Sequence, residues 1–114
     1  MSKGLSYEYT GTKGHIVDVA SSLPDRPEPL LKEGWEDISN PSGKEKGHWK
    51  LQEKSTGLII GFDEGVKGEP GFHGKNHYHI FNPDATSNMD LYLDANGNPV
   101  PKSSKQSHIL PGGV

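Results

Sequence analysis

The sequence predicts a mostly antiparallel β fold with very little helix. Hairpin-turn signals at Ser55-Thr56-Gly57 and at Asn96-Gly97 each separate two short runs of strand-favouring residues. The composition agrees, because 15 glycines, 9 prolines and only 30% apolar residues are typical of a loop-rich chain with a modest core. A length of 114 residues favours one domain.

The N-terminal part predicts little regular structure. We expect a flexible leader over residues 1–14 and a single domain over residues 15–114. Residues 15–20 fit either a first strand or a short helix. Three prolines between positions 24 and 29 exclude a helix interior there, and residues 28–33 fit one or two helical turns that end at Gly34.

The middle of the chain contains the clearest hairpin. Residues 35–38 predict a strand that is broken by Asn40-Pro41-Ser42-Gly43. Residues 48–52 and 58–62 follow as two paired strands, and we expect Trp49 or Leu51 to pack near Ile60.

The second half continues the same pattern. A glycine-rich loop over residues 63–74 leads into a strand at 76–81, and short strands at 91–93 and 98–100 flank the Asn96-Gly97 turn. Pro99 and Pro101 confine that strand to a sheet edge, since proline cannot donate to a ladder. Residues 107–111 fit a short final strand.

Charge and cysteine content exclude some functions. The net charge of −3 does not favour nonspecific nucleic-acid binding through bulk charge, although it leaves room for a local basic site. The chain has no cysteine, so disulfides and thiolate metal ligands are impossible. No apolar run approaches the roughly 20 residues of a membrane span, and no signal peptide is visible. We therefore expect either a cytosolic protein or a fragment of a larger one.

The candidate functional segment holds three of the six histidines, His73, His77 and His79. His77 and His79 are two residues apart, so on a strand they share one face. Two imidazoles on one face can act as general base and general acid, or can bind a phosphate. The alternative that both histidines are only structural, one ring exposed and the other hydrogen-bonded to a loop carbonyl, stays open.

Neighbouring residues extend this candidate site. Lys75 falls on the same face if the strand starts early, where it could stabilise the charge of a phosphorane. His108 is next to apolar residues that tie down the C-terminal segment, and it is the third candidate catalytic histidine. His73, Ser107 and Tyr78 are the candidate substrate-binding residues, although Tyr78 points to the opposite face and is more typical of a core aromatic.

Two further histidines, His15 and His48, stand alone and are expected to be structural or exposed. Metal binding is the main rival chemistry. His73, His77 and His79 with a carboxylate such as Asp90 could form a site, but His-x-His alone is a weak signal. An HNH-type nuclease also needs a helix after its hairpin, and Asn82-Pro83 with the polar loop that follows offers none.

Several short motifs together resemble a known class of proteins. They are Pro27-Glu28-Pro29-Leu30-Leu31 with Gly34-Trp35, Thr56-Gly57, Phe62-Asp63-Glu64-Gly65, Gly68-x-Pro70-Gly71-x-x-Gly74-Lys75-x-His77-Tyr78-His79-x-x-Asn82-Pro83, Tyr92-Leu93-Asp94-x-x-Gly97-Asn98-Pro99-Val100 and Ser107-His108-Ile109. Over roughly residues 16–111 the chain resembles the C-terminal toxin modules of bacterial polymorphic toxins, such as Rhs-repeat and contact-dependent inhibition proteins. The Gly74-Lys75-x-His77-Tyr78-His79 segment is the most specific part.

The resemblance implies a small antibacterial toxin that is secreted or delivered into the cytoplasm of a target bacterium as the C-terminal part of a larger protein. Its partners would be an RNA substrate and a cognate immunity protein. Many such modules are metal-independent ribonucleases of the barnase–EndoU–colicin–RelE group, which need no cofactor. The implied fold class is α+β, a mostly antiparallel sheet of four to five strands with a short helical N-terminal part, from which the poor helix signal here departs.

Three functions therefore remain open. The first is a metal-independent ribonuclease that uses histidine acid–base catalysis with the RNA 2′-hydroxyl as nucleophile. The second is a metal-dependent, HNH-like DNase, which a chelator would inhibit. The third is a non-catalytic secreted interaction module, whose expression without a partner would be harmless.

Overall fold

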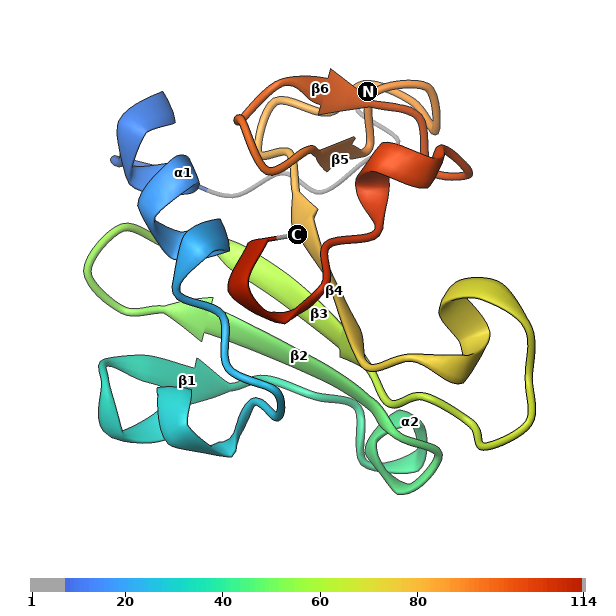
Figure 1. Ribbon diagram of the computed structural model, residues 1–114. Coiled ribbons are helices and arrows are strands. Elements are labelled where there is room, and N and C mark those ends of the chain that lie inside the picture. The colour runs from blue at the N-terminus through green and yellow to red at the C-terminus, as the bar shows by residue number, and fades with distance from the viewer. Residues whose placement is uncertain (1–7, 114) are drawn as a thin grey trace.

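The protein has an α+β fold built on one six-stranded antiparallel sheet, as a computed structural model that describes residues 8–113 shows (Figure 1). The strands lie in the order β1-β2-β3-β4-β5-β6, so each strand pairs with its neighbours along the chain. The predicted fold class is confirmed, with one strand more than the upper number expected.

The elements of the sheet are short, as the loop-rich composition predicts. The strands are β1 (Trp35–Asp37), β2 (His48–Glu53), β3 (Ile59–Asp63), β4 (His77–Phe81), β5 (Tyr92–Leu93) and β6 (Pro99–Val100). The helices are α1 (Lys13–Ser21) and α2 (Pro41–Glu45), and the 3₁₀ segments are η1 (Glu28–Lys32), η2 (Gly71–Gly74), η3 (Lys105–Ser107) and η4 (Pro111–Gly113).

Both predicted hairpins are present. Gly57 follows β2 with a φ of 84°, and Gly97 lies in the β5–β6 turn with a φ of 84°. This left-handed backbone conformation costs glycine little and disfavours residues with a side chain. Leu51 pairs with Ile60 in the register of β2 and β3, which confirms the expected contact of the hairpin.

The N-terminal segment forms a helix rather than a strand. Thr12 caps α1, with its hydroxyl accepting from the His15 backbone N–H. The residues that α1 buries, Ile16, Val19 and Ala20, recur at helical spacing. α1 begins at Lys13, two residues inside the segment that we expected to be a flexible leader, and residues 1–7 of that segment lie outside the described part.

The second helix occupies a segment that we expected to be a simple break between strands. Asn40 accepts a hydrogen bond from the Ser42 N–H, and Pro41 follows at the first helical position. Asparagine at the N-cap and proline at the first helical position are favoured starts of a helix. The sequence signal was therefore visible, and its interpretation as a loop was wrong.

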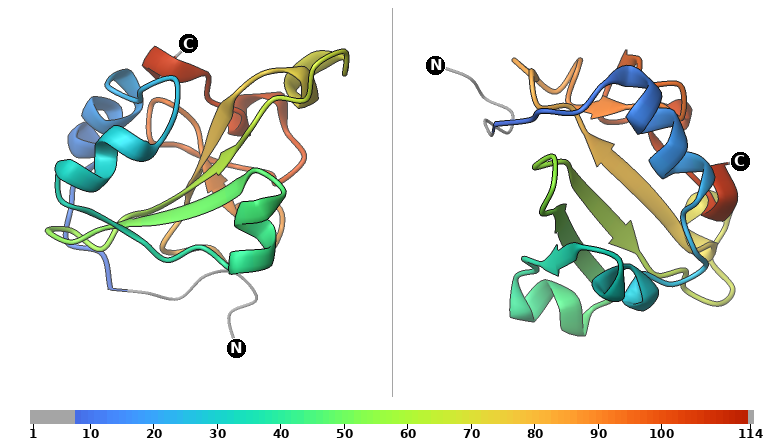
Figure 2. Two further views of the ribbon diagram at one scale, coloured as in Figure 1. Left: turned by 90° about the horizontal axis from the view of Figure 1, so that it is seen from below. Right: turned by 90° about the vertical axis from the view of Figure 1, so that its left-hand side faces the viewer.

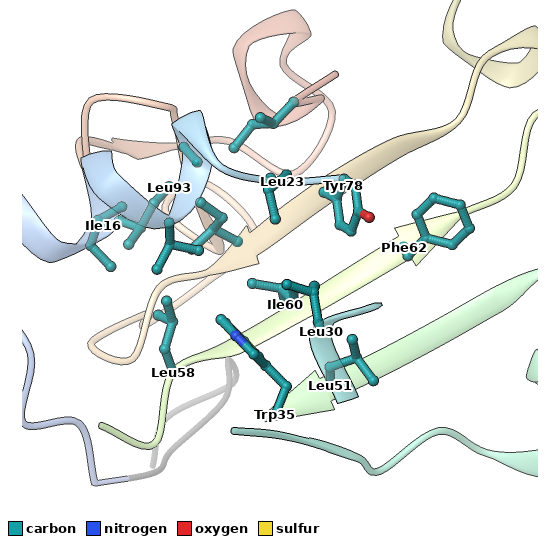
Figure 3. Close-up of a cluster of buried hydrophobic side chains, with 14 residues drawn as sticks. Ile16, Leu23, Leu30, Trp35, Leu51, Leu58, Ile60, Phe62, Tyr78 and Leu93 are labelled. Atoms are coloured by element: carbon teal, nitrogen blue, oxygen red, sulfur yellow. The ribbon is translucent and has the colours of Figure 1, made fainter. Parts of the chain in front are cut away.

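The core lies between one face of the sheet and α1, η1 and the C-terminal segment. Figure 3 shows Leu51, Ile60 and Tyr78 on the face that meets Ile16, Leu23 and Leu30. The Tyr78 and Phe62 rings pack with centroids 5.0 Å apart. The other face of β3 and β4 carries the polar side chains of Asp63, His77 and His79, together with Phe81.

The C-terminal segment returns to the middle of the sheet. Instead of the strand expected over residues 107–111, Ile109 forms an isolated bridge with Tyr78 of β4. Two hydrogen bonds hold it, from Tyr78 N–H to the Ile109 carbonyl at 2.7 Å and from Ile109 N–H to the Tyr78 carbonyl at 2.9 Å. Beyond the bridge, η4 lies beside α1 (Figure 2).

None of the helices formed by residues 8–113 combines the length and the apolar character that a membrane crossing requires.

Candidate active site

A row of polar side chains crosses the open face of the sheet. Asp63 ends β3, where it pairs with His48 of β2 on one side and with His77 of β4 on the other. Two residues along, Gly61 pairs with His79. Because side chains alternate along a strand, these five positions share one face, whereas Tyr78 lies on the core face. The prediction that His77 and His79 share a face is confirmed.

The carboxylate of Asp63 is the centre of this row. Its Oδ1 lies 2.7 Å from His48 Nδ1, and its Oδ2 lies 3.2 Å from His77 Nε2 and 3.4 Å from His79 Nε2. Burial alone raises the pKa of Asp63, but the hydrogen bonds from His77, His79 and His48 outweigh it and hold the pKa far below its usual range. Asp63 is therefore an anion that three imidazoles surround.

The geometry of His77 favours the doubly protonated imidazolium. Its Nδ1 lies 3.0 Å from the Lys75 carbonyl oxygen and its Nε2 faces Asp63, so both ring nitrogens meet acceptors. Burial lowers the pKa of His77, but the hydrogen bond to Asp63 and then that to the Lys75 carbonyl raise it above its ordinary value. His77 is buried, with a side chain that is 7% exposed.

The ring of His79 is stacked on Tyr92, with centroids 4.5 Å apart and an angle of 24° between the planes. Its Nε2 faces Asp63, whereas its buried Nδ1 has no hydrogen-bond partner among the described residues. A buried polar atom without a partner is costly, and a catalytic role or a bound water or ion is among the reasons for which proteins keep one. His79 thus offers an unused nitrogen within the site.

The C-terminal bridge brings His108 to the same place. Its ring lies 5.1 Å from that of His77 and 4.8 Å from that of His79, centroid to centroid. The Nδ1 atom lies 2.9 Å from the Ser104 carbonyl, so it is the protonated nitrogen and Nε2 of the neutral ring keeps its lone pair. Burial, followed by the charges of His79 and His77, lowers the pKa of His108.

These rings line one wall of a cleft of about 490 Å³. The exposed cations Lys46 and Lys102 also line the cleft, and so does the carboxylate of Glu64. Arg26 Nη1 lies 2.7 Å from Glu64 Oε1, so this carboxylate is already paired. The local charge of the cleft is therefore more positive than the net charge of the chain, which suits an anionic substrate.

Two candidate residues lie at the margin of the site. His73 is exposed in η2 and lines the cleft, as a substrate contact requires. Lys75 does not extend the face of His77, because β4 begins only at His77. It lines a neighbouring cleft of about 570 Å³ with Lys105, and Phe72 and His108 line both clefts. Among the three clustered histidines, His108 is the one that shares a cleft with Lys75.

Two other candidates are buried and already bonded. Tyr78 is 0% exposed and its hydroxyl donates to the Pro24 carbonyl at 2.7 Å, so it holds the core instead of facing the cleft. Ser107 is also 0% exposed, and its hydroxyl donates to the Ser104 carbonyl at 2.7 Å. Neither side chain has a surface for a substrate, so the predicted binding role of both is not supported by their position.

Sequence reasoning missed two members of the site. Asp63 was seen only as part of a motif, and His48 was expected to be structural or exposed. His48 is indeed exposed, but its ring is bonded to Asp63. Only the strand register reveals this contact. His15, by contrast, lies outside the site and is paired with Glu53 at 2.6 Å.

The same cluster is the place where the chain could hold a metal ion. Within residues 8–113, ring nitrogens of His77, His79 and His108 all lie within 4.8 Å of one another. The set suggested by the sequence was different, since it included His73 and Asp90. Asp90 instead accepts backbone hydrogen bonds from Thr86 and Ser87.

No protein-family model matches the chain, and no curated protein or solved structure matches it.

Proposed function

We propose that this protein is a metal-independent endoribonuclease that cleaves RNA with the substrate 2′-hydroxyl as nucleophile. The observation that carries the proposal is that two adjacent rings have hydrogen-bond partners that favour opposite protonation states. His77 has acceptors at both nitrogens, and His108 has a free lone pair on Nε2. Neighbouring groups with opposed protonation are what an acid and a base require.

The steps follow from these roles. His108 Nε2 takes the proton of the 2′-hydroxyl, whose oxygen attacks the adjacent phosphorus. The bond from phosphorus to the 5′-oxygen breaks, and that oxygen replaces Asp63 Oδ2 as the acceptor of the His77 Nε2–H and takes its proton. The products are a 2′,3′-cyclic phosphate and a free 5′-hydroxyl, and water enters only if the cyclic ester is later hydrolysed.

Asp63 and His48 act as positioning residues in this scheme. Asp63 Oδ2 holds His77 at 3.2 Å and favours its cationic form. His48 holds the other carboxylate oxygen at 2.7 Å, which fixes the orientation of Asp63. The buried cationic ring of His77 also provides positive charge close to the place where a phosphorane would form.

The test uses a DNA oligonucleotide that contains a single ribonucleotide, in buffer with EDTA. We expect cleavage only after the ribonucleotide, with a 2′,3′-cyclic phosphate end, and no cleavage when that position carries a 2′-O-methyl group. His77→Ala and His108→Ala should each lose at least ~10²-fold in rate, since general acid–base groups contribute about 10²–10⁴. The matched control is His15→Ala, which lies outside the cleft and should keep the wild-type rate. Equal cleavage of an all-DNA strand would overturn the proposal.

A second candidate is a metal-dependent nuclease. It is favoured by the mutual proximity of the three histidine nitrogens and by the unpartnered Nδ1 of His79. The HNH form of this candidate lacks support, because residues 82–91 after β4 contain turns and no helix. Cleavage that EDTA abolishes and added Zn²⁺ or Mg²⁺ restores would favour this second candidate.

The biological role that we propose is that of an antibacterial toxin, which rests on the resemblance of the Gly74–His79 segment to polymorphic toxin modules. Delivery into a target bacterium and neutralisation by an immunity protein belong to the same proposal. Expression in the bacterial cytoplasm without a partner should arrest growth and degrade total RNA, and His108→Ala should abolish both effects. Harmless expression of the folded wild-type chain would favour a non-catalytic interaction module instead.

A further inference from the structure

Gly61 lies in the middle of β3, between Lys50 of β2 and His79 of β4. Its φ is not among the positive values of the described glycines, so the backbone does not require glycine here. A Cβ atom at this position would meet the Phe81 ring at 3.5 Å and the Trp49 carbonyl oxygen at 3.7 Å, which are ordinary contacts. Packing does not require glycine either.

Glycine in a strand costs stability, because it loses more conformational freedom on folding than other residues do. At Gly61 the missing side chain leaves room for the Phe81 ring, which comes within ordinary contact distance on the open face. Gly61 and Phe81 line a hollow of about 530 Å³, within the size range of ligand sites.

The walls of this hollow suit a flat aromatic ligand. Phe81 and Tyr92 line it, together with Ile38. The Phe81 and Tyr92 rings are edge to face, with centroids 5.1 Å apart. Lys50 Nζ lies 5.0 Å from the Phe81 centroid, and none of the ion pairs within residues 8–113 includes Lys50. Aromatic walls beside an available cation are the chemistry that binds single-stranded nucleic acid.

The hollow is continuous with the candidate active site. His48, Asp63, His79 and Tyr92 line both this cleft and the cleft that holds His77 and His108. A nucleic-acid strand with a phosphate at the histidines therefore places an adjacent base over Gly61. A duplex cannot present a base in this way, because its bases are stacked and paired.

We propose that the hollow over Gly61 is a nucleobase subsite, which binds one of the two bases that flank the scissile phosphate of single-stranded RNA. This inference rests on the proposed ribonuclease function for its substrate class. It goes further by assigning the subsite to a specific glycine and to the aromatic residues around it.

The test fills the hollow. Gly61→Val adds a side chain that strands favour, and its Cβ atom makes only ordinary contacts, so the variant should fold. We expect its KM for the single-ribonucleotide substrate to rise at least tenfold with kcat changed less than threefold, and Gly61→Ala should fall between. Gly14→Ala, on exposed α1, is the control with unchanged KM.

Substrates with an abasic position on either side of the ribonucleotide make the assignment specific. With one of these substrates, the KM of the wild type should rise to the value that Gly61→Val has with the intact substrate. With the same abasic substrate, the KM of Gly61→Val should not rise further. The subsite would be refuted if Gly61→Val had the wild-type KM, or if each abasic substrate raised the KM of both proteins by the same factor. Neither outcome would contradict the ribonuclease function.

A binding measurement separates the two proposals if no substrate is cleaved. A fluorescein-labelled single-stranded 2′-O-methyl oligonucleotide should bind the wild type, and its fluorescence anisotropy measures the affinity. The affinity should be at least tenfold weaker for Gly61→Val and unchanged for Gly14→Ala. Identical titrations for wild type and Gly61→Val would refute the subsite whatever the catalytic result.

Discussion

Replacing Asp63 with asparagine tests the electrostatics of the site without changing its shape. The carboxylate lies at the centre of three imidazoles, 2.7 Å from His48, 3.2 Å from His77 and 3.4 Å from His79. Asparagine keeps the size and one acceptor oxygen, but it removes the negative charge and turns a donor toward a ring N–H. His77 then loses the partner that favours its cationic form.

The size of the effect follows from the bond that is lost. A hydrogen bond to a charged group contributes about 1.5–3 kcal/mol, and each 1.4 kcal/mol is a factor of ten. Losing the bond from His77 to Asp63 should therefore lower the cleavage rate at neutral pH by about 10- to 100-fold. The pH profile should change as well, because Asp63 raises the pKa of His77. Without it the acid deprotonates earlier, and the alkaline limb of the profile moves to lower pH.

The assay is the initial rate of cleavage of the single-ribonucleotide substrate across the acid and neutral range, with the fold verified by circular dichroism. Asp18→Asn is the matched control, since Asp18 is an exposed carboxylate on α1, away from the cleft. His48→Ala should lower the rate by less than Asp63→Asn does and shift the limb in the same direction. A folded Asp63→Asn protein with an unchanged profile and a rate within about twofold of wild type would refute the role of Asp63, because even the lower bound of the lost bond predicts about tenfold.

The remaining predictions concern metal and stability. EDTA should leave the cleavage rate unchanged. If EDTA abolished cleavage and Zn²⁺ restored it, the three histidines would instead be metal ligands of the metal-dependent candidate. In urea unfolding, Leu51→Ala should lower the free energy of unfolding by about 2–5 kcal/mol, because Leu51 is fully buried. Tyr78→Phe should lower it by about 1–3 kcal/mol, because the Pro24 carbonyl loses its hydrogen-bond donor. Losses near zero would contradict the core described above. Because the pKa of His77 is raised in the folded protein, its stabilisation is complete below the unfolded pKa of about 6.5 and is lost as pH rises through the folded pKa. Because the pKa of Asp63 is lowered, its stabilisation is present above the unfolded pKa of about 3.9 and is lost in acid. The stability difference between wild type and Asp63→Asn should thus be largest between about pH 4 and 6.5, and a difference independent of pH would refute it.

The fold features that the sequence predicted correctly are those with a local cause. Gly57 and Gly97 mark the hairpins because their turns need positive φ, and both glycines have it. The shared face of His77 and His79 follows from the two-residue period of any strand. The helix α2 was missed although its signal is equally local, because Asn40-Pro41 was read as a breaker instead of an N-cap followed by proline.

Asp63 could not be found in this way. It is 14 residues before His77, and the intervening segment contains a 3₁₀ turn and no repeat that fixes its length. Which residue of β3 faces His77 depends on the register, and a shift by one residue would place Phe62 there and Asp63 on the core face. The buried apolar face of β3 fixes that register, so the position of the Asp63 carboxylate is a consequence of core packing.

The position of His108 depends on one further contact of the same kind. β5 pairs with Ile80 and Phe81 only, so the first half of β4 has a free edge on that side. Ile109 fills this edge through its two hydrogen bonds with Tyr78, and its side chain is buried in the core. Because neighbouring residues of an extended segment point to opposite faces, burial of Ile109 turns His108 toward the side of His77 and His79. Tyr78, which we first considered as a substrate contact, thus acts through its backbone and its buried ring: it anchors the segment that carries the proposed base.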